Sequence, residues 1–168
     1  IKQMSVRQSL LAAVAASIIA LAVVPASAQT LRYANQGDLK SLDPYTLNES
    51  TTHAHLDQVF EGLVARDKDL KVVPGLAERW ETPEPTRWRF YLRKGVKFHG
   101  GEPFTADDVI FSAERALSPE SNIKSRIAAG TKLAKVDDHT VDFILTAPNP
   151  ILHYEWDTWY IFSKTWAE

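Results

Sequence analysis

Histidine and acidic side chains cluster near residue 55, where they could bind a metal ion. His53, His55 and Asp57 alternate along the chain, and imidazole and carboxylate groups are common metal ligands. The apolar residues that follow recur with helical spacing, however, and on a helix His53 and Asp57 share a face that excludes His55. The spacing therefore indicates a surface pair, and we expect no metal site here.

Other reactive chemistry has little support in the residue pattern. Neither a G-x-S-x-G nucleophile elbow nor a glycine-rich phosphate loop occurs. The chain has no cysteine, which excludes disulfides, thiolate metal sites and a cysteine nucleophile. Paired carboxylates for glycoside hydrolysis cannot be recognised, because their separation in space is not visible in a sequence. We therefore expect a protein without a catalytic set, which is compatible with binding.

Anion and nucleic-acid binding are also disfavoured. Among 168 residues, Lys and Arg number 19 and Asp and Glu number 21, which gives a formal net charge of −2. A protein that binds the phosphate backbone normally has a basic excess. Arg87, Arg89 and Arg93 could bind an anion, but alternating arginines are more typical of the solvent face of a strand.

An export signal is expected over 1–28. Arg7 supplies a positive charge, residues 10–24 are apolar, and the small residues 26–28 form a pattern that signal peptidase can cleave. The apolar run is shorter than the roughly 20 residues that a membrane-spanning helix needs, so we expect cleavage after Ala28. Because no cysteine follows, the mature protein should lie in the periplasm without a lipid anchor.

The residues just described must be positioned by helices and strands, and the first predicted element is a helix. Ser50 or Thr51 is expected to cap it. Apolar side chains from Leu56 to Leu63 then recur at i, i+3, i+4 and i+7, as on one face of a helix.

A second helix is predicted between Thr105 and Pro119. Thr105 followed by Asp108 is a capping-box pattern, and Pro119 ends the helix. Phe111 lies off its apolar face, where it is either a lone exposed aromatic residue or a contact to a neighbouring domain.

Strands are predicted on both sides of this helix. In 87–93 every second residue is apolar, which is typical of a strand with one buried face. Lys94-Gly95 should turn the chain so that 96–98 forms the second arm of a hairpin. Residues 140–145 alternate in the same way after a turn at 137–139. The chain is thus predicted to mix α and β elements.

The end of the sequence is rich in large aromatic residues, namely Trp156, Trp159, Tyr160, Phe162 and Trp166. A small domain buries only part of its surface. We expect these rings to lack burial partners within this sequence, and therefore expect the chain to be truncated.

Several segments resemble the extracellular solute-binding proteins of family five, the periplasmic peptide-binding components of ABC importers. The matching segments are SLDP at 41–44, FEGL at 60–63, PGLAERWE at 74–81, WRFYLRKGVKFHGG at 88–101, PFTADDV at 103–109 and DHTV at 138–141. Gly100 departs from the family pattern, which usually has Asp at this position.

The resemblance implies an α/β fold of the bilobed periplasmic binding protein type (class II), here incomplete. It implies that residues 29–45 start lobe one, that 46–147 form a small extra α+β domain, and that 148–168 return toward lobe one. Only one side of the ligand cleft would then be present, and half a cleft should bind weakly.

The function implied by the resemblance is capture of peptides or similar small solutes for an ABC permease and its ATPase. It implies a monomer with no catalytic residue, no cofactor and no nucleic-acid partner. Relatives also bind nickel complexes, haem, opines or oligosaccharides. An alternative is a secreted hydrolase, which requires carboxylates or a Ser/His pair converging in one pocket.

Two groups of residues would contact the ligand if the resemblance holds. The first is the loop after SLDP, formed by Thr46, Leu47, Asn48 and Glu49. Asn48 could hydrogen-bond a peptide main chain and Glu49 could pair with an amino group, or both could simply cap the helix that follows. The second is formed by Trp156, Trp159 and Tyr160, which either line the cleft as an apolar wall or pack in the core.

Overall fold

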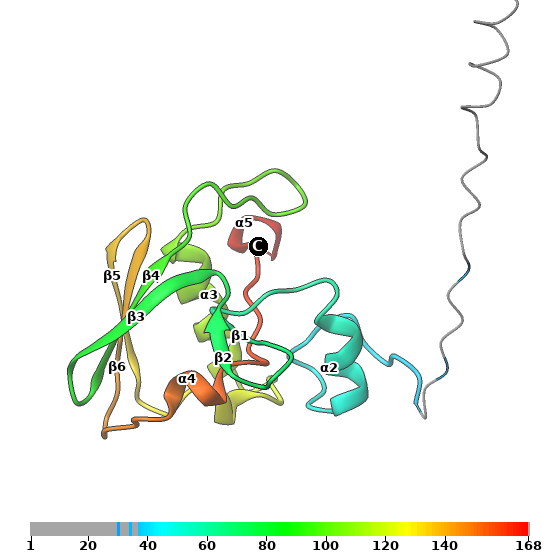
Figure 1. The fold of residues 1–168 in the computed structure, drawn as a ribbon, viewed down its shortest axis with the longest axis horizontal. Helices are drawn as coiled ribbons and strands as arrows, with labels where there is room; N and C mark the ends of the chain where they lie inside the picture. The colour runs from blue at the N-terminus through cyan, green and yellow to red at the C-terminus, as the bar shows by residue number, and fades with distance from the viewer. Residues whose placement is uncertain (1–29, 31–33, 35–36, 168) are drawn as a thin grey trace, which may run out of the picture. The chain divides into compact units, whose positions relative to one another are not determined.

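The computed structural model describes Thr30, Ala34 and residues 37–167, so the export signal expected over 1–28 lies outside the described residues. The described residues from 37 to 167 form one compact unit. Its elements, shown in Figure 1, are α2 (Ser50–Leu56), β1 (Val64–Arg66), β2 (Val72–Pro74), β3 (Ala77–Glu84), β4 (Arg87–Leu92), α3 (Ala106–Leu117), the 3-10 helix η1 (Lys124–Arg126), β5 (Lys132–Asp137), β6 (Thr140–Ile144), α4 (Leu152–Glu155) and α5 (Lys164–Ala167).

Four strands form an antiparallel sheet in the order β3-β4-β6-β5. The alternation predicted for 87–93 is confirmed, because Trp88, Phe90 and Leu92 of β4 are buried while the residues between them are half-buried. In β6, Val141 and Phe143 are fully buried and pair with residues of β4. The two strands with the clearest apolar pattern therefore occupy the centre of the sheet.

The hairpin predicted between β4 and 96–98 is wrong. β4 pairs with β3 on one side and β6 on the other, whereas Lys97 makes only an isolated bridge with Pro103. β3 was not predicted because its sequence, AERWETPE, has few apolar residues and contains a proline. In the structure most of its residues are exposed. Such a sequence is tolerated at the edge of a sheet, where one side of the strand needs no partner.

The β5–β6 hairpin completes the other edge. β5 was also not predicted, because its residues are mostly exposed or half-buried and show no strict alternation. The turn expected at 137–139 is confirmed, and the Asp137 carboxylate accepts the backbone N–H of His139 at 2.7 Å.

Helix α3 packs against the sheet and agrees with its prediction. The Asp108 carboxylate accepts the backbone N–H of Thr105 at 2.8 Å and its hydroxyl at 3.1 Å, as in a capping box. The helix ends at Leu117, just before Pro119. Phe111 is half-buried against the core, so it is not a lone exposed ring.

Helix α2 is shorter than predicted. It ends at Leu56, after which Val59 is exposed and Leu63 leads into β1. Gly62 forms a bridge with Tyr160, and a Cβ atom at Gly62 would lie 2.8 Å from the Trp159 carbonyl oxygen. The chain therefore leaves the helix to pass close to the 159–160 backbone.

The cap expected at Ser50 or Thr51 is wrong as well. Glu49 occupies the N-cap position, and its side chain makes no capping hydrogen bond.

The aromatic residues near the end of the sequence find burial partners within the unit, contrary to our expectation. Trp156 and Trp159 are 0% exposed, and Tyr160 and Phe162 are also buried, whereas Trp166 is 75% exposed. The Trp156 ring lies 4.6 Å from that of Phe143 and 4.9 Å from that of Trp159, both in edge-to-face geometry. These rings fill the space beneath the sheet.

No helix in the described part of the chain is long and apolar enough to span a lipid bilayer.

Candidate functional site

The loop at 46–49 follows a turn that Asp43 holds in place. The Asp43 carboxylate accepts the backbone N–H of Tyr45 at 2.9 Å, and both of its oxygens accept N–H groups of Arg115 on α3. Burial opposes ionisation of Asp43, but the Arg115 hydrogen bonds and charge, together with the Tyr45 N–H, outweigh it and hold the pKa of the carboxyl below its usual value. Asp43 is thus a charged tie between this turn and α3.

Tyr45 connects the loop to the far end of the chain. Its buried hydroxyl donates to the Tyr160 carbonyl oxygen at 2.6 Å and accepts the Trp159 indole N–H at 3.0 Å. Burial raises the pKa of Tyr45 well above its usual value, so the hydroxyl keeps the proton it donates. Trp159 and Tyr160 therefore support the loop from beneath.

The start of the loop is held by Asn122. The backbone N–H of Asn122 donates to the Tyr45 carbonyl at 2.8 Å, and its side-chain amide donates to the Thr46 carbonyl. Leu47 is half-buried, whereas Asn48 and Glu49 are exposed.

Glu49 and Asn48 do not act as helix caps. The Glu49 carboxylate lies 3.7 Å from the Lys40 ammonium, and both side chains are largely exposed. Asn48 instead contacts His53, one turn into α2: the Asn48 amide oxygen is 3.0 Å from the His53 Nε2 atom. The structure therefore does not support the alternative that the Asn48 and Glu49 side chains cap helix α2.

His53 is buried, with 8% of its surface exposed, so our expectation of a surface pair with Asp57 is wrong. Its ring centroid is 5.9 Å from that of Tyr160, whose hydroxyl donates to the Asp57 carboxylate. Burial and the nearby positive charge of Arg126 lower the pKa of His53, against the smaller opposing effects of Asp57 and Asp157. Contacts thus run from Asn48 in the loop through the His53 ring to the buried Tyr160 ring, and the exposed Asp57 binds the Tyr160 hydroxyl.

His55 makes a different contact, with its Nδ1 atom 2.8 Å from the Thr51 carbonyl oxygen. Among the residues that the structure describes, no three His, Cys, Asp or Glu side chains are grouped to hold a metal ion.

Trp156 lies deeper. Its indole N–H donates to the Arg126 carbonyl at 2.7 Å, and its ring stacks on Phe90. Because Trp156, Trp159 and Tyr160 are all buried in this unit, their burial favours the core alternative over the apolar wall. Their contact with a ligand stays a prediction.

The arginines of β4 contact an acidic residue on the neighbouring strand. Arg89 makes two hydrogen bonds to the Asp142 carboxylate, at 2.7 and 2.8 Å, and an Arg87 nitrogen lies 3.6 Å from the same group. The Asp142 carboxylate therefore occupies the place of an external anion beside Arg87 and Arg89. This arrangement favours the interpretation of these arginines as the outer face of a strand over that of an anion site.

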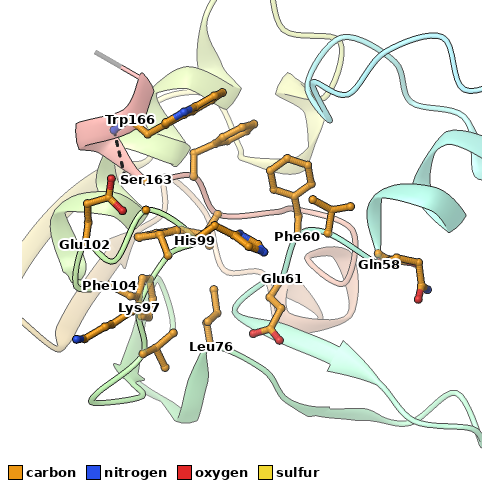
Figure 2. Close-up of a pocket in the computed structure, with 17 residues that line it drawn as sticks. Gln58, Phe60, Glu61, Leu76, Lys97, His99, Glu102, Phe104, Ser163 and Trp166 are labelled. Atoms are coloured by element: carbon orange, nitrogen blue, oxygen red, sulfur yellow. Dashed lines mark hydrogen bonds between the residues drawn. The ribbon is translucent and has the colours of Figure 1, made fainter. Parts of the chain in front are cut away.

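A second candidate site is a cavity of about 810 Å³, shown in Figure 2. Trp166 lies at one end and Gln58 at the other. Its walls are mainly aromatic and apolar, with Phe60, Phe98, Phe104, Phe162 and Leu76 among them. None of the seven residues predicted to contact a ligand lines this cavity.

Histidine, serine and carboxylate groups also border this cavity, as the hydrolase alternative requires. Ser163 and His99 both line it, but the Ser163 hydroxyl oxygen accepts the backbone N–H of Trp166 at 3.2 Å. No hydrogen bond joins Ser163 to His99 within residues 37–167. The cavity therefore offers no assembled nucleophile–base pair.

Gly100, where the family pattern usually has aspartate, lies next to the Glu102 side chain. A Cβ atom at Gly100 would lie 2.5 Å from each carboxylate oxygen of Glu102. A side chain at this position would therefore require the end of the flexible Glu102 side chain to move aside.

Three residues of this arrangement were not identified from the sequence: Tyr45, His53 as a partner of Asn48, and Asn122. Tyr45 directly follows the SLDP motif, which was a usable signal. No local pattern indicates the other two, because each acts through a contact that depends on the folded chain.

Comparison with known proteins supports the resemblance. The model of bacterial extracellular solute-binding proteins, family 5 (middle), matches residues 71–167, more than half of the chain. The chain is 32% identical to the periplasmic oligopeptide-binding protein OppA of Escherichia coli, over 90% of this chain and 33% of that protein. It therefore spans about a third of that relative's length.

Solved structures agree with this comparison. Haemophilus influenzae OppA in complex with the peptide RPPGFSPFR superimposes with a TM-score of 0.69 and 26% identity, covering 74% of this chain and 29% of that one. MoaA of A. tumefaciens R10 in complex with mannopinic acid has a TM-score of 0.68 and 30% identity, covering 76% and 28%. The chain matches part of bilobed binding proteins, as the predicted fold class requires.

Proposed function

Because the chain belongs to the family 5 bacterial extracellular solute-binding proteins, we propose that it captures peptides or similar small solutes in the periplasm for an ABC importer. The solute would pass unchanged to a permease driven by an ATPase. The observation that carries this proposal is the loop at 46–49, which is exposed at Asn48 and Glu49 yet held in place. Asn122 donates to the Thr46 carbonyl and to the carbonyl of the preceding Tyr45, and His53 contacts the Asn48 side chain.

A rigid loop with exposed polar groups suits binding. Affinity improves when the contacting groups are ordered before the ligand arrives, because less conformational entropy is lost on binding. The ties to Tyr45 and Asn122 provide this order, and the Asp43–Arg115 pair holds the preceding turn on α3. Thr46 and Leu47 would shape the loop, and Asn48 and Glu49 would contact the ligand.

The remaining predictions fit the same proposal. The chain would be exported, cleaved after Ala28 and act as a monomer. Residues 46–147 would be the small α+β domain between two passages through lobe one, at 29–45 and 148–168. A second lobe would close over the ligand by a hinge motion. Trp156, Trp159 and Tyr160 would stabilise the first side of the cleft from within.

A titration tests the proposal. The ¹⁵N-labelled chain is titrated with the peptide trialanine, and backbone amide shifts are followed by NMR. We expect saturable shifts centred on 46–49, with an affinity weaker than about micromolar because most of the ligand surface stays uncovered. Mannopinic acid in a parallel titration distinguishes peptide from opine preference.

Two outcomes would contradict the proposal. One is the absence of saturable shifts at 46–49 with either compound. The other is cleavage of trialanine, detected by mass spectrometry, which would favour the hydrolase alternative. Thr131→Ala serves as a matched control, because it alters a polar residue outside the loop and its supports.

A further inference from the structure

We propose that His53 is a positioning residue: it orients the Asn48 side chain so that the loop at 46–49 offers N–H donors to a carbonyl oxygen of the ligand. This inference rests on the proposed role of the loop in binding and adds which chemical group the loop selects.

The first step is the position of the proton on the His53 ring. The Nε2 atom is 3.0 Å from the Asn48 amide oxygen, whereas the Nδ1 atom is buried and has no hydrogen-bond partner. A neutral imidazole has one donor nitrogen and one acceptor nitrogen. A buried N–H without a partner is rarer than an unpaired acceptor. The proton therefore belongs on Nε2, and the Nδ1 atom carries the unpaired acceptor.

The second step is the orientation of Asn48. With Nε2–H as donor, the Asn48 amide oxygen is the acceptor and is occupied by His53. The amide NH₂ group of this exposed residue is then directed away from the His53 contact, with two donors to offer. Asn48 alone could present either its oxygen or its NH₂ group to a ligand. The contact with His53 selects the NH₂ group.

The third step is the choice among oxygen acceptors. Glu49 is adjacent and exposed, and its carboxylate is only weakly compensated by the exposed Lys40 at 3.7 Å. A ligand carboxylate at this position would be repelled by Glu49. A neutral peptide carbonyl would not, and a nearby ammonium group of the ligand would be attracted. The loop is thus suited to a peptide carbonyl close to a free amino terminus.

The fourth step is the rigidity of His53. The residue is 8% exposed, and its ring packs near the Tyr160 ring, whose hydroxyl is bound to Asp57. A side chain enclosed in this way cannot rotate freely, so the direction of its Nε2–H is set by the core. The core therefore determines the donor pattern that the surface presents.

The first measurement is independent of any ligand. The chain is labelled with ¹⁵N-histidine, and long-range ¹H–¹⁵N spectra at neutral pH identify the protonated ring nitrogen of each histidine. We expect a protonated Nε2 and an unprotonated Nδ1 for His53. A proton on Nδ1 would overturn the inference whatever the binding result, because Asn48 would then have to present its oxygen.

The second measurement compares variants in the trialanine titration. We expect His53→Leu to weaken binding about tenfold, which corresponds to roughly one hydrogen bond. His53→Gln restores most of this loss, because its side-chain amide can donate to the Asn48 oxygen. Asn48→Asp keeps an acceptor for His53 but removes the donors, and should weaken binding as much as His53→Leu.

The outcomes separate this inference from the proposed function. If trialanine shifts no residue in the wild-type chain, the proposed function fails, whereas the NMR spectra of His53 still decide the proton position. If the wild-type chain binds and both His53→Leu and Asn48→Asp bind equally well, the inference alone is overturned. Should His53→Leu fail to fold, Asn48→Asp and the proton position decide the question.

Discussion

Asp43 shows how one side chain of a sequence motif acts through several partners. In the sequence Asp43 is part of the SLDP motif, and no pattern in the neighbouring residues indicates that it pairs with a cationic side chain. In the structure it ties the turn to Arg115, whose guanidinium also lies over the Tyr45 and Phe162 rings at 5.1 and 4.7 Å. The motif is thus explained by loop positioning rather than by ligand contact.

At the same scale, His53 predicts a pH dependence of stability. Its pKa is lowered in the folded chain by burial and by Arg126, and burial lowers that of His153 as well. The unfolded chain therefore takes up protons at about pH 6.5 while the folded chain remains neutral to lower pH, so stability is complete above about pH 6.5 and falls as the pH drops below it.

Urea unfolding at a series of pH values checks this. The unfolding midpoint should decrease from about pH 7 to about pH 5, and His53→Gln should make the decrease smaller. His99→Gln is the matched control, because His99 is exposed, and it should leave the slope unchanged. A midpoint that rises toward pH 5 would contradict the prediction.

At the scale of elements, the end of α2 is decided by a close backbone approach. The apolar stripe from Leu56 to Leu63 satisfies helical spacing, but the chain unwinds after Leu56 and passes next to the 159–160 backbone at Gly62. A helix through Gly62 would forgo the bridge with Tyr160 and the hydrogen bond from Ile161 N–H to the Glu61 carbonyl at 2.9 Å. Tertiary pairing therefore outweighs local periodicity here.

Gly62→Ala is accordingly expected to destabilise the unit. The new Cβ atom would lie 2.8 Å from the Trp159 carbonyl oxygen and 3.1 Å from that of Val64, and backbone atoms cannot move aside as a flexible side chain can. We expect a loss of about 2 kcal/mol in the free energy of unfolding, measured by urea denaturation. Gly37→Ala is the control, because its Cβ atom would meet only Thr51 side-chain atoms at 3.7 Å or more; equal effects of the two substitutions would refute the explanation.

At the scale of the whole molecule, the described chain is held together by contacts between its two ends. Tyr45 near the start and Trp159 and Tyr160 near the end share a buried hydrogen-bond pair, and all lie within or against one hydrophobic core. Helix α2 and the loop before it lie on the opposite side of β1 and β2 from the four-stranded sheet, as Figure 1 shows. Tyr45 is therefore a main link between the loop and the core.

Tyr45→Phe tests this link. The substitution keeps the ring but removes the hydroxyl, which leaves the buried Trp159 indole N–H and the Tyr160 carbonyl without this partner. We expect a loss of about 1–3 kcal/mol in unfolding free energy and faster amide hydrogen exchange at 46–49. Tyr91→Phe is the control, because the Tyr91 hydroxyl bonds Glu81 at the exposed face of the sheet. Unchanged exchange at 46–49 in Tyr45→Phe would show that the loop is ordered by other contacts.

The family, helix α3 and the central strands β4 and β6 could be predicted from the sequence alone. A capping box joins residues three positions apart, and strand alternation repeats every two residues, so both signals are local. The motif segments from 41 to 141 likewise lie in the sequence in the family's order.

Only the tertiary structure decided the edge strands β3 and β5, the end of α2, the burial of Trp156 and Trp159, and the partner of Asn48. Edge strands need little apolar patterning, because a neighbouring strand supplies their hydrogen bonds. The orientation of Asn48 likewise depends on His53 being enclosed by Tyr160, a residue that lies at the other end of the described chain. Such contacts join residues far apart in the sequence, and no local pattern contains them.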